Sequence, residues 1–344
     1  MKIRFFNPGI GYLKIKKEVD QEIQRVLKAG DLILRQDVEV FEKTLADYIG
    51  VKYAVALNSC TDALYLALRA LKIGSGDKVM VPSRTFVATA QVVIQVGAKP
   101  VFYDLDGYSE EKMENMRAII PVHIEGTIQE EMGRLAEFCK EKDIYLIEDA
   151  AQALGASQGG KMAGSFGDVG CFSFYPAKIL GAYGDAGMLT TNNQEIYEWV
   201  KGARNHFKED SRDWGVNSRC DNVQAAILNV KFKYLPAILK IRQNIAEKYQ
   251  KGLEGTALGL PLHIEGRVWQ DYVIQTEGKD ERNKLFEFLK EKGVETMKNN
   301  YPFPVPKMVL AQKYEDSTLR LPISEVLTND EIQYVIDKIK EFFK

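Results

Sequence analysis

The sequence predicts an α/β protein in which a large, mostly parallel sheet lies between layers of helices and is followed by a smaller α+β domain. Strand-like apolar runs alternate with helix-periodic runs through the first two-thirds of the chain. That alternation is typical of a parallel sheet covered on both faces. The chain has 344 residues, enough for two domains. We expect an N-terminal arm and a large domain at 1–240, and a small C-terminal domain at 241–344.

The large domain is expected to begin with an arm and a first helix within residues 1–30. Short apolar runs beyond it predict buried strands, whereas runs with an apolar residue at every third or fourth position predict helices. In the helix expected at 61–73, for example, Leu64, Leu68 and Leu71 share one face. Strands are expected at 53–57, 77–83, 100–106, 118–124 and 144–150, and further helices at 86–97 and 129–142.

The pattern changes near residue 231, where a long helix at 233–253 leaves the first domain. A strand-like run follows at 267–276, and helix-periodic runs follow at 281–293 and 329–344. A strand followed by helices, without the earlier alternation, predicts a smaller α+β domain.

Composition and charge exclude several classes of protein. The formal net charge of −2 provides no basic excess to hold a nucleic acid backbone. The first residues lack the apolar core of a signal peptide and no run approaches membrane-spanning length, so we expect a cytoplasmic protein without membrane contact. The cysteines form no CxxC pair, which argues against a zinc site and a disulfide scaffold; they are Cys60, Cys139, Cys171 and Cys220.

The segment from Ser173 to Gly187 places Lys178 among aromatic residues and glycines. The run CFSFYP before Lys178 is too apolar for a solvated loop, and the glycines after it permit close backbone approach. A lysine in such surroundings loses hydration, so its amine is more readily neutral and nucleophilic. Asp149 follows an apolar run upstream. A lysine and a carboxylate paired in this way are what pyridoxal phosphate chemistry needs.

Other polar residues follow predicted strands. Ser59 and Thr61 stand at the start of a helix, whose free N–H groups and dipole suit a phosphate, although a plain N-cap is the favoured interpretation of this segment taken alone. Asp149 and Gln152 follow a predicted strand, at the end where ligands bind in open parallel sheets. Alternatively, they are turn residues that cap the next segment. The histidines match no metal motif, so we expect each to be structural; they are His123, His206 and His263.

These motifs occur in order along most of the chain, and together they resemble the sugar-nucleotide aminotransferases of the DegT/DnrJ/EryC1/StrS family. The resemblance runs from about Ile23 to about Val230 and implies the fold type I aminotransferase architecture, whereas the C-terminal third matches only in outline. The segments that carry it are VKYAVALNSCTDALYLALRAL, VPSRTFVATAQ, GAKPVFYDLD, PVHIEG, LIEDAAQALGA, GSFGDVGCFSFYPAKILGAYGDAG, ARNH and GVNSRCDNVQAAIL.

The resemblance implies pyridoxal 5′-phosphate as the cofactor and a role for each matching residue. Lys178 would be the catalytic residue and would hold the cofactor aldehyde as a Schiff base. Asp149 would pair with the pyridine nitrogen, Gln152 would approach the ring hydroxyl, and Phe86 would stack on the ring face. The residues at the phosphate end of the cofactor would be Ser59, Cys60, Thr61 and Ser173.

The resemblance also implies a homodimer with active sites at its interface, because Asn217 would reach the phosphate bound in the neighbouring subunit. Several residues depart from the family pattern. Cys60 stands where glycine is usual, so its side chain must point away from the phosphate or the loop must shift. Ile179 and Ala186 stand where Asn and Gly are usual. In segments that help to shape the sugar pocket, histidines are common where this chain has Gln270, Asn300 and Lys307.

We therefore expect an aminotransferase that moves the amino group of L-glutamate to a keto-deoxysugar nucleotide. Its product would be an amino sugar for polysaccharide, glycan or glycoside biosynthesis, such as the O-antigen of lipopolysaccharide. The segment 301–306, YPFPVP, resembles the 3-keto-sugar enzymes somewhat more than the 4-keto ones.

Three alternatives stay open. A sugar dehydratase of the same family would carry His in place of Lys178, so the lysine argues against it. An aminotransferase acting on a non-sugar carbonyl is compatible with the divergent C-terminal segments. A non-catalytic regulator that keeps the cofactor fold would explain the departures at Cys60, Ile179 and Ala186, but not the presence of Lys178 with Asp149.

Overall fold

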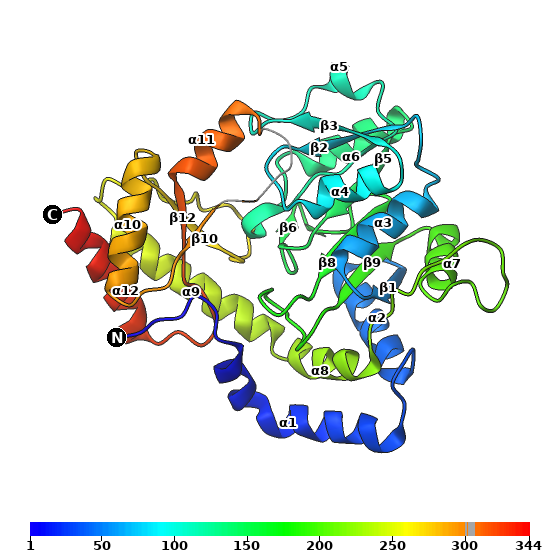
Figure 1. Ribbon diagram of the computed structural model, residues 1–344, viewed down its shortest axis with the longest axis horizontal. Coiled ribbons are helices and arrows are strands. Elements are labelled where there is room, and N and C mark those ends of the chain that lie inside the picture. Colours follow the sequence, from blue (N-terminus) through cyan, green and yellow to red (C-terminus); the bar gives the residue numbers. More distant parts are fainter. Residues whose placement is uncertain (300, 302–306) are drawn as a thin grey trace.

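A seven-stranded sheet forms the centre of the N-terminal part of the molecule in the computed structural model, which describes residues 1–299, 301 and 307–344 (Figure 1). The strand order is β1-β9-β8-β5-β4-β2-β3. The pairs from β8 to β3 are parallel, and β9 pairs antiparallel with both β8 and β1. The strands are β1 (Tyr53–Leu57), β2 (Lys78–Pro82), β3 (Lys99–Tyr103), β4 (Ala118–Ile119), β5 (Tyr145–Asp149), β8 (Val169–Ser173) and β9 (Gly187–Thr191).

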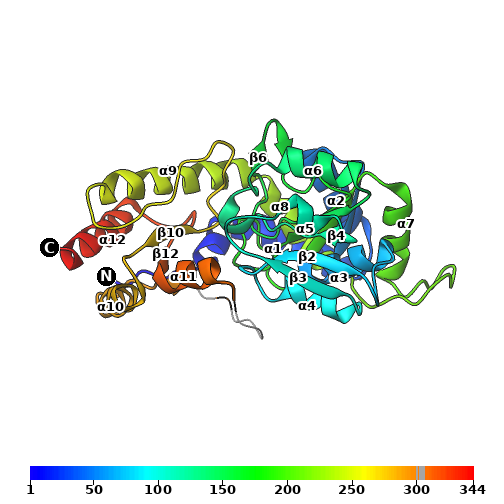
Figure 2. The same cartoon turned by 90° about the horizontal axis from the view of Figure 1, so that it is seen from above.

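Helices cover both faces of this sheet (Figure 2). Side chains alternate along β1, so Ala54 and Ala56 join the core under α2, α6 and α8, whereas Val55 and Leu57 join the core under α3, α4 and α7. These helices are α2 (Gln36–Ile49), α3 (Cys60–Ala70), α4 (Ala88–Gln95), α6 (Met132–Glu141), α7 (Gln194–Ala203) and α8 (Asn222–Phe232). Shorter elements are α5 (Glu110–Met113), η1 (Ile124–Gly126) and the hairpin β6 (Ser157–Gln158) and β7 (Lys161–Met162).

A second, antiparallel sheet with the order β10-β12-β11 lies in the C-terminal part. Its core also takes in Ile3, which bridges to Val294, so the first residues of the chain pack with its last third. The long N-terminal helix α1 (Pro8–Ala29) packs on α8 instead. The elements of this part are α9 (Leu235–Leu253), β10 (Tyr272–Gln275), α10 (Lys279–Glu291), β11 (Met297–Lys298), α11 (Val309–Ser317), β12 (Thr318–Leu321) and α12 (Asn329–Phe342).

The structure confirms the predicted strands and helices of the first part, with shorter boundaries. The strand expected at 267–276 begins only at Tyr272. The reason lies before it, where the carbonyls of Trp269 and Gln270 accept hydrogen bonds from Arg242 on α9 rather than from a neighbouring strand. The strands β8 and β9 were not among those predicted, although Lys178 lies on the connection between them.

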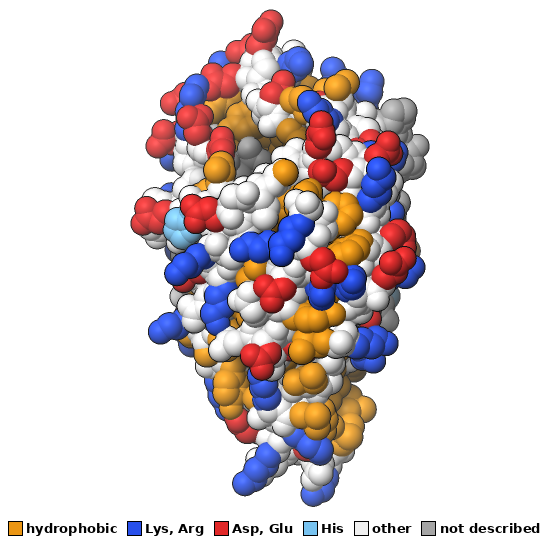
Figure 3. All heavy atoms as spheres, turned by 90° about the vertical axis from the view of Figure 1, so that its left-hand side faces the viewer, with side chains coloured by type: hydrophobic (Ala, Val, Ile, Leu, Met, Phe, Trp, Pro, Cys, Tyr) orange, Lys and Arg blue, Asp and Glu red, His pale blue; other side chains and the backbone are white. Residues whose placement is uncertain are grey.

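Among the described residues, no helix is long and apolar enough to cross a membrane, and no group of His, Cys, Asp and Glu side chains could hold a metal ion. The four cysteines are free and buried. On the face seen in Figure 3, acidic and basic side chains are interspersed, in keeping with the small net charge.

Candidate functional site

The carboxyl ends of β1, β5 and β8 meet at one edge of the large sheet, where ligands bind in open α/β folds. Gly187, at the start of β9, connects the strands of this edge, because it pairs with Ser173 on β8 and with Leu57 on β1. A Cβ at Gly187 would lie 2.2 Å from the carbonyl carbon of Ser59. Only glycine therefore allows the start of α3 to approach β8 so closely, which brings Ser59 and Ser173 to the same place.

Helix α3 presents its N-terminus to this edge. Ser59 has an extended backbone, and its Oγ accepts a hydrogen bond from the Asp62 N–H at 3.1 Å. Ser59 is therefore the N-cap of α3, which was one of the two interpretations of this segment from the sequence. A cap satisfies one of the first N–H groups of the helix and leaves others free to bind an anion.

Asp149 ends β5 with its carboxylate buried at 5% exposure. One oxygen accepts from the Thr89 hydroxyl at 2.8 Å, and the other accepts from the Ala151 N–H at 3.2 Å. Burial raises the pKa of Asp149, and these hydrogen bonds oppose the shift. The carboxylate forms no ion pair with any described residue, although the charge of Lys178 acts to lower its pKa.

The neighbouring Glu148 points to the other face, as expected from strand alternation. Its carboxylate accepts the backbone N–H groups of Gly164, Phe166 and Gly167 at 2.6–2.8 Å. It also lies 2.9 Å from Nε2 of His123, whose Nδ1 accepts the Gln129 N–H at 3.2 Å and so leaves Nε2 to carry the proton. Glu148 and His123 are therefore structural, in agreement with the expectation for the histidine.

Lys178 lies on the connection between β8 and β9. Burial lowers the pKa of its amine, whereas the charges of Asp271 and Asp149 act in the opposite direction. The amine makes no hydrogen bond to a described residue. Lys178 is thus a partly buried lysine on the connection that follows β8, and the catalytic role expected for it stays a prediction.

Gln270 holds the backbone on both sides of Lys178. Its Nε2 donates to the Ala177 carbonyl at 3.1 Å, and its Oε1 accepts from the Ile179 N–H at 3.1 Å. Sequence reasoning missed this role, since the resemblance placed Gln270 among residues that shape the sugar pocket. The only signal in the sequence was the glutamine in place of the usual histidine.

We expect Gln270→Ala to lower kcat by about 10²-fold while changing KM much less, because a misplaced reacting group costs about this much. The matched control is Gln243→Ala, which removes a hydrogen bond to the Trp269 ring in the same segment but does not touch the Lys178 loop. Steady-state kinetics of both variants tests the role. A Gln270→Ala enzyme with the wild-type kcat would show that the hydrogen bonds to the loop are dispensable.

The other predicted residues lie around this centre. Gln152 accepts the Glu125 N–H at 2.7 Å and donates to the Tyr301 hydroxyl at 3.3 Å, which leaves one amide hydrogen for a ligand. The Sγ of Cys60 lies 4.0 Å from Asp149, and burial raises the pKa of this thiol well above its usual value. The Phe86 ring is 56% exposed.

Three predicted residues lie apart from this centre or outside the described part. Asn217 is exposed and forms an isolated bridge with Asn205. Lys307 donates to the Tyr301 carbonyl at 2.5 Å and pairs with Glu315. Asn300 and most of the YPFPVP segment, residues 302–306, lie outside the described residues.

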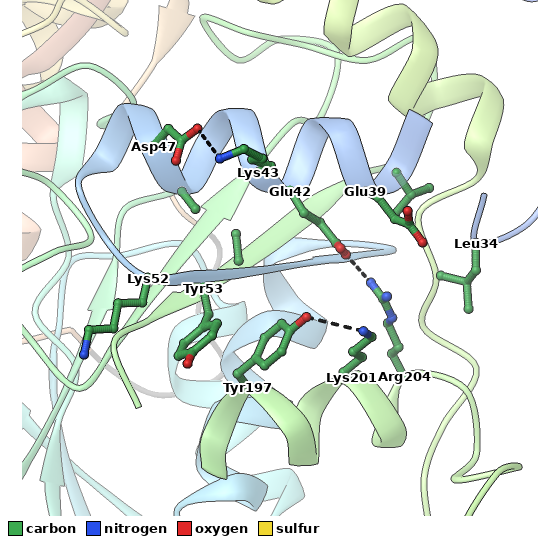
Figure 4. A pocket seen from close by; sticks show the side chains of 13 residues that line it. Leu34, Glu39, Glu42, Lys43, Asp47, Lys52, Tyr53, Tyr197, Lys201 and Arg204 are labelled. Atoms are coloured by element: carbon green, nitrogen blue, oxygen red, sulfur yellow. Dashed lines mark hydrogen bonds and ion pairs between the residues drawn. The ribbon is translucent and has the colours of Figure 1, made fainter. Parts of the chain in front are cut away.

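A separate cavity of about 380 Å³ lies beside the edge strand β1 (Figure 4). In it Glu42 and Arg204 form an ion pair and bind the outward backbone of Ala56: the carboxylate accepts its N–H at 2.8 Å, and the guanidinium donates to its carbonyl at 2.9 Å. These side chains cover a strand edge that would otherwise be open to pairing. The cavity is thus explained by the fold and is not the candidate active site.

Comparison with known proteins identifies the family of the chain. A model of the DegT/DnrJ/EryC1/StrS aminotransferase family matches residues 13–340. A dTDP-3-amino-3,4,6-trideoxy-α-D-glucose transaminase of Streptomyces venezuelae is 34% identical, covering 99% of this chain and 96% of that protein. A pleiotropic regulatory protein of Geobacillus stearothermophilus is 35% identical, covering 97% and 96%.

Among solved structures, the crystal structure of DesV from S. venezuelae in complex with a ketimine intermediate matches with a TM-score of 0.92 and 33% identity. The match covers 100% of this chain and 99% of DesV. The expected fold type I aminotransferase architecture is therefore confirmed.

Proposed function

Because the chain belongs to the DegT/DnrJ/EryC1/StrS aminotransferase family, whose members use pyridoxal phosphate, we propose that it transfers the amino group of L-glutamate to a keto-sugar nucleotide. One observation carries this proposal: a lysine of lowered pKa lies at the same sheet edge as a buried carboxylate that has no cation partner. A protonated pyridine nitrogen at Asp149 would supply that cation, so the residues present fit the cofactor.

Other residues of this edge would supply the remaining contacts to the cofactor. The free N–H groups at the start of α3, with the hydroxyls of Thr61 and Ser173, would bind its phosphate. The free amide hydrogen of Gln152 would bind the ring hydroxyl, and Phe86 would cover one face of the ring. Cys60 would stay a neutral thiol beside Asp149, since its raised pKa keeps it protonated.

Bound pyridoxal phosphate supplies an aldehyde that carries the amino group and a ring that accepts the electron pair left when the substrate Cα loses its proton. Lys178 supplies the proton transfer. Its lowered pKa would leave the amine free to take the substrate Cα proton as a general base and to release it again as a general acid. Asp149 favours the protonated ring by its charge, an effect that burial strengthens. The expected kinetics are ping-pong.

The acceptor is proposed from the relatives and not from a contact in the site. The S. venezuelae relative is named for a dTDP-sugar aminated at C3, which supports a 3-keto sugar over a 4-keto sugar. The product would be an amino sugar for a polysaccharide or glycoside. The second candidate is a regulatory protein, because the G. stearothermophilus relative is named as one.

The visible spectrum of the purified holoenzyme separates these candidates. Adding L-glutamate should convert the absorption of the pyridoxal form to that of the pyridoxamine form, and a 3-keto-sugar nucleotide should reverse the change. If no amino donor changes the spectrum, the protein is not an aminotransferase, and the result favours the proposal of a regulatory protein. If the donor works but only non-sugar carbonyls reverse the change, the acceptor class is wrong.

We also propose a homodimer in which each Asn217 completes the partner's phosphate site. Asn217 is exposed on its own subunit, and exposed aromatic rings occur at Phe86, Tyr175 and Trp214. Large apolar side chains exposed in this way are what a subunit interface covers.

This arrangement predicts complementation between two defective variants. Lys178→Ala and Asn217→Ala dimers should each have low activity, but a mixed dimer would hold one site with an intact Lys178 and an intact partner Asn217. Mixing and reassociating equal amounts should restore about a quarter of the wild-type sites, since half of the dimers are mixed and have one intact site each. If Asn217 served its own subunit, mixing would restore nothing.

A further inference from the structure

Two buried threonine hydroxyls stand behind Asp149, the carboxylate proposed to pair with the ring nitrogen. Thr89 lies in the first turn of α4 and donates its hydroxyl hydrogen to Asp149 Oδ2 at 2.8 Å. The oxygen of the same hydroxyl lies 2.8 Å from the Thr85 hydroxyl. Both threonines are 0% exposed, so bulk solvent does not reach these groups. Asp149 therefore ends a short, buried chain of hydroxyl groups.

The direction of this chain follows from the hydrogens that each group has. An ionised carboxylate only accepts hydrogen bonds, and a threonine hydroxyl has a single hydrogen. Thr89 gives its hydrogen to Asp149, so the bond between the two threonines must use the hydrogen of Thr85. The two hydroxyls therefore point in sequence toward the carboxylate, Thr85 to Thr89 and Thr89 to Asp149.

A protonated Asp149 does not fit the same chain. A proton on Oδ2 would reverse both bonds and leave the Thr85 hydrogen without an acceptor among the described residues. A proton on Oδ1 would stand beside the Ala151 N–H, which already donates to that oxygen at 3.2 Å, and the Sγ of Cys60 is 4.0 Å away. Either protonated form thus buries a hydrogen that has no described partner, which is costly.

Other titratable groups around Asp149 come from four further segments; they are Lys178, His123, Cys60 and Cys171. None of these four side chains donates an N–H or O–H to the carboxylate. The two thiols stay neutral, because burial raises the pKa of each well above its usual value. Burial also raises the pKa of Asp149, and among the influences that lower it the hydrogen bond from Thr89 is the largest. The threonine chain is therefore the main support of the ionised carboxylate.

We propose that Thr85 and Thr89 are positioning residues that hold Asp149 ionised and oriented toward the ring nitrogen of the cofactor. This rests on the proposed function, in which Asp149 pairs with a protonated pyridine nitrogen. The same two residues flank Phe86, which is 56% exposed although both threonines are fully buried. The segment anchored by the threonines thus presents the Phe86 ring outward and supplies the hydrogen bond to Asp149.

Binding of two ligands to the apoprotein tests this role without turnover. They are pyridoxal 5′-phosphate and its 1-deaza analogue, in which a carbon replaces the ring nitrogen, and absorbance titrations give the Kd of each. The wild type should prefer pyridoxal phosphate. Thr89→Val keeps the shape of the side chain but should weaken binding of pyridoxal phosphate by about 10–100-fold, the range for a lost hydrogen bond to a charged group, and affect the analogue much less. Thr85→Val should act in the same direction by only about 3–10-fold, since its bond joins neutral groups.

Further variants separate the hydroxyl group from packing. Thr89→Ser keeps the hydroxyl and should bind both ligands within a few-fold of the wild type. The matched control is Thr190→Val, which removes another buried threonine hydroxyl, one that donates to the carbonyls of Gly164 and Gly170. It should leave both Kd values unchanged. If Thr89→Val does not fold, the smaller selective loss in Thr85→Val decides the question.

The preference for pyridoxal phosphate over the analogue should also depend on pH. Without the Thr89 hydrogen bond the pKa of Asp149 is higher, so on acidification the Thr89→Val protein should lose the preference at a higher pH than the wild type. Equal losses of affinity for both ligands, or a preference that neither Thr89→Val nor Thr85→Val reduces, would overturn the inference and leave the proposed amine transfer intact. A wild type that binds both ligands equally would overturn it together with the proposed role of Asp149.

Discussion

Replacing Lys178 with alanine is expected to abolish both halves of amine transfer, lowering the rate by about 10⁴-fold or more, the upper range for proton transfer by a positioned side chain. An alanine can neither bind the cofactor aldehyde nor carry the Cα proton. Single-turnover spectra with L-glutamate measure the loss directly. Since Lys178 makes no side-chain hydrogen bond to a described residue, the circular dichroism spectrum should stay that of the wild type.

The matched control for this experiment is Lys231→Ala. Lys231 is also a partly buried lysine whose pKa is lowered by burial, but its amine donates to the Gly181 carbonyl and lies 4.7 Å from the centre of the Tyr183 ring. We expect this variant to keep the half-reaction within a few-fold of the wild-type rate. Wild-type turnover by Lys178→Ala would refute the assignment of the catalytic lysine.

The parts of the site that the sequence predicts well are those fixed by local pattern. Asp149 ends an apolar run and Ser59 precedes a helical run, so the strand and helix boundaries alone place both at a strand end. Lys178 could not be singled out by its apolar neighbours alone, and its proposed role depends on the ordered motifs that resemble the family. The alternation of strands and helices likewise predicts the large sheet and its two helical layers.

The parts that could not be predicted depend on contacts between distant segments. Gln270 reaches Lys178 only because Arg242 holds the carbonyl groups before β10, which shortens a strand that periodicity extends to 267. A hydrogen-bonded link from Glu125 to Arg320 passes through Asn299 and joins three segments far apart in the sequence. Neither periodicity nor spacing contains information about such pairings, which tertiary packing sets.

Asp149→Asn is expected to have the second-largest effect, lowering amine transfer by about 10²–10³-fold, the range for removing one preorganised electrostatic group. The amide has nearly the shape of the carboxylate. Its oxygen can still accept the Ala151 N–H, and its NH₂ group can donate to the Thr89 hydroxyl if that hydroxyl donates to Thr85 instead. It cannot, however, stabilise a protonated ring nitrogen by its charge. The loss should therefore appear in kcat with little change in the fold.

The same substitution should stabilise the protein without its cofactor. Burial raises the pKa of Asp149 above its ordinary value of 3.8, so folding favours the protonated form and the group's contribution to stability is lost as the pH rises through the raised pKa. The gain in melting temperature of the Asp149→Asn apoprotein over the wild type should accordingly be small in acid and grow toward neutral pH.

Glu148→Gln provides the matched control for both effects, since Glu148 is the preceding carboxylate on the same strand but its charge is bound by three backbone N–H groups. It should destabilise the protein and leave the rate per folded molecule unchanged. An Asp149→Asn variant that is less stable than the wild type at neutral pH, or as active, would contradict the view that Asp149 is a buried anion reserved for a cationic ligand. A stabilised but inactive Asp149→Asn protein would mean that this carboxylate is kept at a cost to the fold because the ring nitrogen requires it.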